Sequence, residues 1–132
     1  MNARISRTLV TTVTATVLVT PVLLAAPAFA KGGGATVKNT GACAGGGVFE
    51  LKAKHDDGRI QVEYEVDTNK AGQTWQVKIT DNGVQVFSGN AKTIAPSGSF
   101  TVRKLIADRT GKDTIRAKAT LGTRSCAGTV AL

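Results

Sequence analysis

Hydrophobic and polar residues alternate with a period of two along most of the chain after residue 48. The clearest run is residues 60–66, which reads Ile-Gln-Val-Glu-Tyr-Glu-Val. A period of two places one set of side chains on each face of a β-strand, whereas a helix needs a period near 3.6. No window shows a convincing helical period. The same alternation recurs in residues 49–54, 75–80, 100–102, 115–121 and 126–130.

Short turn sequences separate these segments. Asp57-Gly58 and Asn82-Gly83 are residue pairs that favour two-residue hairpin turns. Seven or eight short strands, each with a single apolar face, predict an all-β fold, an antiparallel β-sandwich of two packed sheets. A small β-barrel is the alternative, since alternation alone does not show whether the sheet edges close.

Two local features refine this picture. A first strand is predicted at residues 35–39, ahead of a glycine-rich passage at 41–47. Phe87 falls out of phase with Val84 and Val86, the apolar positions of its segment. Phe87 is therefore predicted to be the one exposed aromatic side chain.

The first thirty residues have the features of a secretory signal peptide. Arg4 and Arg7 are their only charged side chains, an apolar stretch follows, and Ala28-Phe29-Ala30 supplies the small residues that a signal peptidase requires. Repeated threonines and an internal proline disfavour the alternative, a transmembrane anchor. We therefore expect cleavage after Ala30 and secretion of a protein that keeps no membrane anchor.

The remaining chain, residues 31–132, has the length of one domain and begins with a flexible glycine-rich start at 31–35. It contains both cysteines, Cys43 and Cys126, which are expected to pair in an oxidising compartment. Such a bond would join the first strand region to the last strand and contribute roughly 4–5 kcal/mol. A redox pair or a metal site would need further cysteines or histidines nearby. We therefore expect a structural disulfide, no metal and no cofactor.

Four runs of sequence carry a resemblance to a known group of proteins. The runs HDDGRIQVEYEVD, GQTWQVKITDNGVQVFSG, SGSFTVRKL and GKDTIRAKA precede the final cysteine. Together they resemble small secreted actinobacterial single-domain immunoglobulin-like proteins. The last segment, residues 111–132, also resembles the closing hairpin of bacterial immunoglobulin-like modules. The resemblance implies fold and export but no particular activity, because such folds host many unrelated functions.

Few residues are suited to catalysis. His55 is the only histidine, and with Asp56, Asp57 and Gly58 it forms a sequence typical of a solvated hairpin turn. The paired carboxylates at 63 and 65 share one strand face, but a flat sheet offers no cleft to raise a carboxyl pKa. The glycines at 45–47 lack the lysine and serine of a phosphate-binding loop. We expect that the protein is not an enzyme.

The positive charge is distributed unevenly. The formal net charge is +8, and residues 31–102 carry eight basic against seven acidic side chains. Residues 103–124 carry seven basic side chains against two acidic ones, which predicts a basic patch on one hairpin. Such a patch suits an anionic polymer, whereas nucleic acid is disfavoured because few aromatics are free to stack on bases. The alternative is that Glu63 and Glu65 neutralise much of the patch across strands. The candidate binding residues are Phe87, Arg103, Arg109, Lys112, Arg116 and Lys118.

Three functional interpretations follow. The leading one is a monomeric, secreted, non-enzymatic binding module whose partner, an extracellular protein or an anionic polymer, is unknown. The second is a binder of a polyanion, such as a cell-wall polymer, through the basic hairpin at 103–124. A protein partner would contact Phe87 and the loops at 90–98 and 105–112. The third interpretation is a small-ligand carrier similar to the enediyne-binding apoproteins, from which this chain differs in its single long-range bridge and its basic charge.

Overall fold

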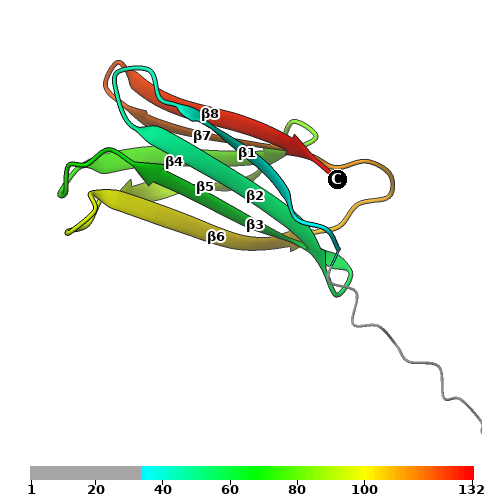
Figure 1. Cartoon of the computed structure of the whole chain (residues 1–132). Helices are drawn as coiled ribbons and strands as arrows, with labels where there is room; N and C mark the ends of the chain where they lie inside the picture. The colour runs from blue at the N-terminus through cyan, green and yellow to red at the C-terminus, as the bar shows by residue number, and fades with distance from the viewer. Residues whose placement is uncertain (1–33) are drawn as a thin grey trace, which may run out of the picture.

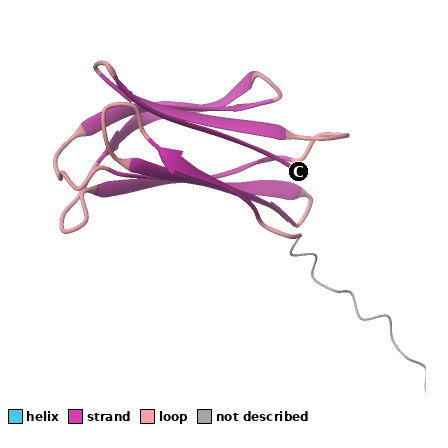
Figure 2. Cartoon of the chain, turned by 45° about the horizontal axis from the view of Figure 1, so that its top comes forward, coloured by secondary structure: helices cyan, strands magenta, loops and turns pink. Residues whose placement is uncertain are grey.

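The computed structural model describes residues 34–132, which form eight antiparallel strands in two packed sheets (Figures 1 and 2). The predicted signal peptide and residues 31–33 of the glycine-rich start lie outside the described residues. Within residues 34–132, no helix is long and apolar enough to cross a membrane. The strands are β1 (Val37–Ala42), β2 (Val48–Asp56), β3 (Arg59–Asp67), β4 (Thr74–Asp81), β5 (Val84–Lys92), β6 (Ser99–Ala107), β7 (Thr114–Leu121) and β8 (Arg124–Ala131).

The strand order places consecutive strands in different sheets at three points of the chain. The first sheet has the order β1-β2-β3-β6 and the second the order β5-β4-β7-β8. The chain therefore crosses between sheets after β3, after β5 and after β6, so that β4 and β5 pair between two crossings. The predicted all-β antiparallel sandwich is confirmed, and the alternative of one closed barrel is wrong because two separate sheets form.

Alternating apolar positions from both sheets meet in the core. In β3, every residue of the apolar set is fully buried, as the sequence pattern requires. Tyr64 buries its ring there and donates a hydrogen bond of 2.9 Å to the carbonyl oxygen of Cys126 in β8. Burial of this hydroxyl raises the pKa of Tyr64 well above its ordinary value. The core thus links the two sheets by one buried polar contact as well as by packing.

The disulfide lies at the edge where β1 and β8 meet, and the prediction of a Cys43–Cys126 bond is confirmed. The bonded residues are 83 positions apart, so the bond ties the end of the first strand to the last strand. Beside it, the buried ring of Phe49 lies between two glycines, Gly41 of β1 and Gly128 of β8. A Cβ atom at either glycine would collide with this ring, so the close packing of the edge depends on their missing side chains.

Both predicted hairpin turns form. Asp57-Gly58 joins β2 to β3 and Asn82-Gly83 joins β4 to β5, and all four residues have positive φ. That pair of conformations matches the right-handed twist of the flanking strands. The predicted first strand at 35–39 is displaced, since β1 spans Val37–Ala42 and pairs with β2 over that range.

The prediction for Phe87 is wrong. The pairing of β4 with β5 shifts at a β-bulge, where Thr80 pairs with Gln85 but Ile79 pairs with Phe87. One extra residue, Val86, reverses the phase of the strand after it. Phe87 therefore packs half-buried against the core, and it is Val84 that stands 48% exposed.

Candidate binding face

The predicted basic hairpin at 103–124 does not form. Its two arms, β6 and β7, lie in different sheets, since β6 pairs with β3 and β7 pairs with β4 and β8. Residues 108–113 are the loop that crosses from one sheet to the other (Figure 1). The expectation assumed that consecutive strands pair, which is common in antiparallel folds but fails where a chain changes sheet. The basic side chains of this segment are consequently divided between two faces.

Arg103 and Lys104 of β6 are occupied by contacts within the fold. Arg103 lies opposite Glu63 and its Nε makes an ion pair of 2.6 Å with that carboxylate. Lys104 occupies an inward position at the edge of the first sheet, and its Nζ lies 4.4 Å from the centroid of the Phe87 ring. An inward-pointing lysine protects an edge strand from pairing with another chain. Neither residue is available as a free cation, and the expected neutralisation by Glu63 holds for Arg103.

Arg109 and Arg124 also have structural partners. Arg109 Nε lies 3.4 Å from the Oδ2 atom of buried Asp81. Arg124 donates hydrogen bonds of 3.0 Å to the carbonyl oxygens of Gly45 and Gly46 while its guanidinium lies 5.0 Å from the ring centroid of Trp75. Arg124 thus fixes the glycine-rich loop over the core. Lys112 is exposed in the same crossing loop as Arg109.

The remaining two predicted residues, Arg116 and Lys118, lie on the outer face of the second sheet. They are joined there by Lys78 of β4 and Lys92 of β5, and all four side chains are exposed. We call the surface formed by Lys78, Lys92, Arg116 and Lys118 the basic face. Most of the other outward positions of β4, β5, β7 and β8 carry threonine, serine, asparagine, glutamine or alanine. No outward position of these four strands carries aspartate or glutamate. Within residues 34–132, no ion pair involves any of these four cations.

The register of β4 and β7 brings two of these cations directly together. Lys78 and Lys118 are Cα partners on the two central strands, and Thr80 is the partner of Arg116. Like charges directly opposite each other in an antiparallel pair destabilise the sheet. Across the outer strands, the partners of Lys78 and Lys118 are Ser88 and Ala127, neither of which is charged. The repulsion between the two lysines is therefore not relieved by any neighbouring carboxylate on this face.

A shallow depression marks the same place. It is lined by Gln76, Lys78, Lys118 and Thr120, which form two adjacent cross-strand pairs of the β4–β7 ladder. Every one of these side chains carries at least one hydrogen-bond donor: two ammonium groups, an amide and a hydroxyl. The depression therefore combines positive charge with neutral donors, which is the chemistry that holds an anion.

The outer face of the first sheet also opposes two like charges, but it supplies counter-charges to one of them. Glu50 and Glu65 are Cα partners in β2 and β3. Lys38 Nζ lies 3.5 Å from Glu50, and Lys52 makes an ion pair with the same carboxylate. The hydrogen bond from Lys52 lowers the pKa of Glu50 below its ordinary value. The same contact raises the pKa of Lys52.

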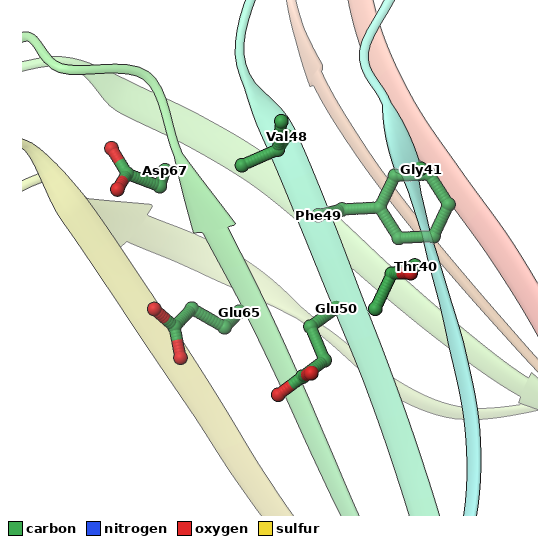
Figure 3. Close-up of a pocket in the computed structure, with 7 residues that line it drawn as sticks. All are labelled: Thr40, Gly41, Val48, Phe49, Glu50, Glu65 and Asp67. Atoms are coloured by element: carbon green, nitrogen blue, oxygen red, sulfur yellow. The ribbon is translucent and has the colours of Figure 1, made fainter.

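A hollow on the first sheet lies beside the pair of Glu50 and Glu65. Figure 3 shows its lining, with the carboxylates of Glu50, Glu65 and Asp67 on the same side of the sheet. It is shallow, and its remaining lining includes the exposed side chain of Val48 and the edge of β1. Such a flat carboxylate surface does not provide the enclosed environment of a catalytic acid. The lining residues are Thr40, Gly41, Val48, Phe49, Glu50, Glu65 and Asp67.

Two carboxylates are buried where the crossing loop packs on β4. Asp81 is fully buried and Asp113 is 1% exposed. Both oxygens of Asp81 lack a hydrogen bond, while Asn82 donates to Asp113 Oδ1 at 3.5 Å. Burial raises the pKa of Asp81, the neighbouring Asp113 charge raises it further, and Arg109 opposes the shift.

His55 and Glu63 make contacts within the fold. His55 Nδ1 lies 3.0 Å from Asp108 Oδ2, a contact that joins the end of β2 to the crossing loop. Glu63 is occupied by Arg103 and by Lys52, whose Nζ lies 3.8 Å away. No group of three metal-ligating side chains occurs in the part of the chain that the structure describes.

Comparison with protein-family models, with curated proteins and with solved structures found no match to this chain. Sequence reasoning missed Lys78 and Lys92, because they lie in a part of the chain whose charges nearly cancel. A signal was present in the alternation, which places Lys78 on the polar side of its strand. This signal alone does not show whether Lys78 is neutralised, because that depends on which strand lies beside β4. The neighbour is β7, which has no outward carboxylate.

Proposed function

We propose that the protein is a secreted, non-enzymatic binding module that holds an anionic polymer on the basic face. The observation that carries the proposal is the absence of any carboxylate among the outward positions of β4 and β7, where three of the four cations lie. The signal-peptide pattern of residues 1–30 and the Cys43–Cys126 bond support an extracellular site of action.

The shape of the face favours a linear polymer over a membrane or a nucleic acid. The outward side chains of β4 and β7 include no aromatic or large aliphatic residue that could enter a lipid layer or stack on a base. A strand of eight residues extends about 26 Å, so that a polymer lying on the sheet meets several cations along its length.

The other two interpretations have less support. A protein partner anchored on Phe87 would have to displace Lys104, which covers that ring. A carrier needs an enclosed space for its ligand, but the space between the sheets is occupied by a continuous cluster of core side chains.

The test is binding to a labelled polyanion, such as polyphosphate, measured by fluorescence anisotropy over a range of salt concentrations. For a face that makes four contacts, the logarithm of the association constant should fall by about three for each tenfold increase in salt. The triple variant K78Q/K92Q/K118Q should lose most of this dependence and at least about tenfold in affinity at low salt.

A matched control removes the same charge elsewhere. The variant K38Q/K54Q/K70Q changes three lysines on the first sheet and in the β3–β4 loop, so it has the same net charge as the test variant. Its affinity should stay within about threefold of the original protein. Equal losses in the two variants would mean that only net charge matters, and that the basic face is not the binding site.

A further inference from the structure

We infer that Lys78, Arg116 and Lys118 form a subsite that takes one tetrahedral oxyanion at a time, so that the polymer recognised is one that carries phosphate groups. This inference rests on the proposed function and specifies its ligand. Its basis is the register of β4 and β7, which gathers three of the four cations of the basic face around one point.

The spacing of the three side chains is fixed by the sheet. Lys78 and Lys118 are direct cross-strand partners, so their Cβ atoms are about 5 Å apart. Arg116 precedes Lys118 by two residues on the same strand face, at about 7 Å, and lies diagonally from Lys78 at a similar distance. The three long side chains can therefore converge on one small anion above the sheet.

The neutral neighbours complete the set of donors. Gln76 and Thr120 line the depression beside the two lysines, and Thr80 is the cross-strand partner of Arg116. A planar carboxylate has two oxygens in one plane, and a single guanidinium fork can contact both of them. A phosphate group presents more oxygens in three dimensions, and it can accept from an arginine fork, two ammonium groups and a hydroxyl simultaneously. Donors that surround a point from two strands therefore fit phosphate better than carboxylate.

The arrangement also explains how the fold tolerates two opposed lysines. Their repulsion weakens the centre of the second sheet, and the structure supplies no carboxylate beside them. An anion held between Lys78 and Lys118 would convert this repulsion into two attractive contacts. Phosphate binding should consequently stabilise the folded protein as well as occupy the site.

The experiment compares two polymers of similar length and charge density, polyphosphate and poly-glutamate, at one salt concentration. The original protein should bind polyphosphate at least about tenfold more tightly. The variant R116K keeps the charge but loses the guanidinium fork, so the preference for polyphosphate should fall to about threefold or less while the salt dependence stays the same. The variant K92Q, which removes the cation outside the subsite, should weaken both polymers and leave their ratio intact.

The location is tested separately with inorganic phosphate. In a titration followed by amide NMR, the largest shifts should fall on residues 76–80 and 116–120. Vesicles of phosphatidylglycerol form a third arm, and they should bind more weakly than polyphosphate if a polymer is the partner. All variants change exposed side chains, and a melting curve of each shows whether it is folded before binding is compared.

The outcomes separate the two proposals. Failure to bind any polyanion would overturn the proposed function. Equal binding of polyphosphate and poly-glutamate, or equal effects of R116K and K92Q on their ratio, would overturn the phosphate subsite and leave the polymer-binding face in place. Tighter binding to the vesicles than to polyphosphate would overturn the choice of a polymer as the partner.

Discussion

The outer faces of the two sheets each place two like charges directly opposite one another, but only one face supplies the counter-charges. On the first sheet, Glu50 opposes Glu65, and Lys38 and Lys52 bind the Glu50 carboxylate. On the second sheet, Lys78 opposes Lys118, and the neighbouring positions are uncharged. The first arrangement is what surface electrostatics alone would favour.

The difference shows how a sandwich of two sheets can leave some outward cations without counter-charges while others are paired. Every acidic residue on an outward strand position lies in β2 or β3, so the outward cation of β6, Arg103, meets a counter-charge and the cations of β7 do not. Arg103 and Arg116, which are close in the sequence, therefore differ in whether a carboxylate neutralises them. Arg103 is paired with Glu63, whereas Arg116 faces Thr80 and solvent.

The largest expected effect comes from removing the disulfide that cross-links the two sheets. The double variant C43S/C126S removes a cross-link across 83 residues and should lose about 4–5 kcal/mol of stability. Chemical denaturation of the oxidised protein and of the variant measures the loss. An unchanged denaturation midpoint would show that the β1–β8 edge is held by packing alone.

The next largest effect concerns Gly128, whose missing side chain leaves room for the Phe49 ring. Gly128→Ala places a methyl group against the Phe49 ring and should cost about 1–3 kcal/mol. The replacement Phe49→Leu removes the obstructing ring atoms, so the cost of Gly128→Ala should shrink in that background. A double-mutant cycle by thermal melting measures the coupling, and additive effects would contradict the packing argument.

The buried carboxyl of Asp81 differs from the charges on the two outer faces, because it is shielded from solvent. Its raised pKa means that the folded state favours the neutral carboxyl. The stability from this group is fully present below the ordinary aspartate pKa, and it is lost as the pH rises through the raised value. Asp81→Asn should therefore stabilise the protein at pH 7 by about 1 kcal/mol, and the gain should disappear near pH 3.

Melting curves of the Asp81→Asn variant and the original protein between pH 3 and pH 8 test this sign. Arg109→Gln removes the cation that lies 3.4 Å from Asp81, so it should destabilise at pH 7 and have little effect at pH 3. Lys112→Gln, in the same loop, is the control and should have little effect at either pH. A loss of stability in Asp81→Asn at pH 7 would mean that the Arg109 pair outweighs the cost of burial.

The smallest expected effect on stability comes from adding one carboxylate to each outer face, which compares the two faces directly. Ser88→Glu gives Lys78 a cross-strand counter-charge, and Gln61→Glu gives one to Lys54 on the first sheet. Each should stabilise by about 0.2–1 kcal/mol, and the two variants have the same net charge. Only Ser88→Glu should weaken binding to a polyanion. Equal binding by both variants would remove the distinction between the faces.

The local pattern of the sequence determined most of the secondary structure. Alternation fixed which side chains of β3 are buried, and Asp57-Gly58 and Asn82-Gly83 fixed two turns, because both signals act between residues near each other in the chain. The pairing of Cys43 with Cys126 was equally determined, since only two cysteines are present. Phe87 was misjudged because a bulge of one residue reverses the phase of a strand.

Only the tertiary structure decided which charges are free. Whether a basic side chain on a strand is neutralised depends on the residue opposite it, and that residue belongs to a strand many positions away. The chain crosses between sheets at residues 108–113, which separates Arg103 from Arg116 and brings Lys78 beside Lys118. Strand order and register are set by the packing of the whole sandwich, so no local pattern could reveal the basic face.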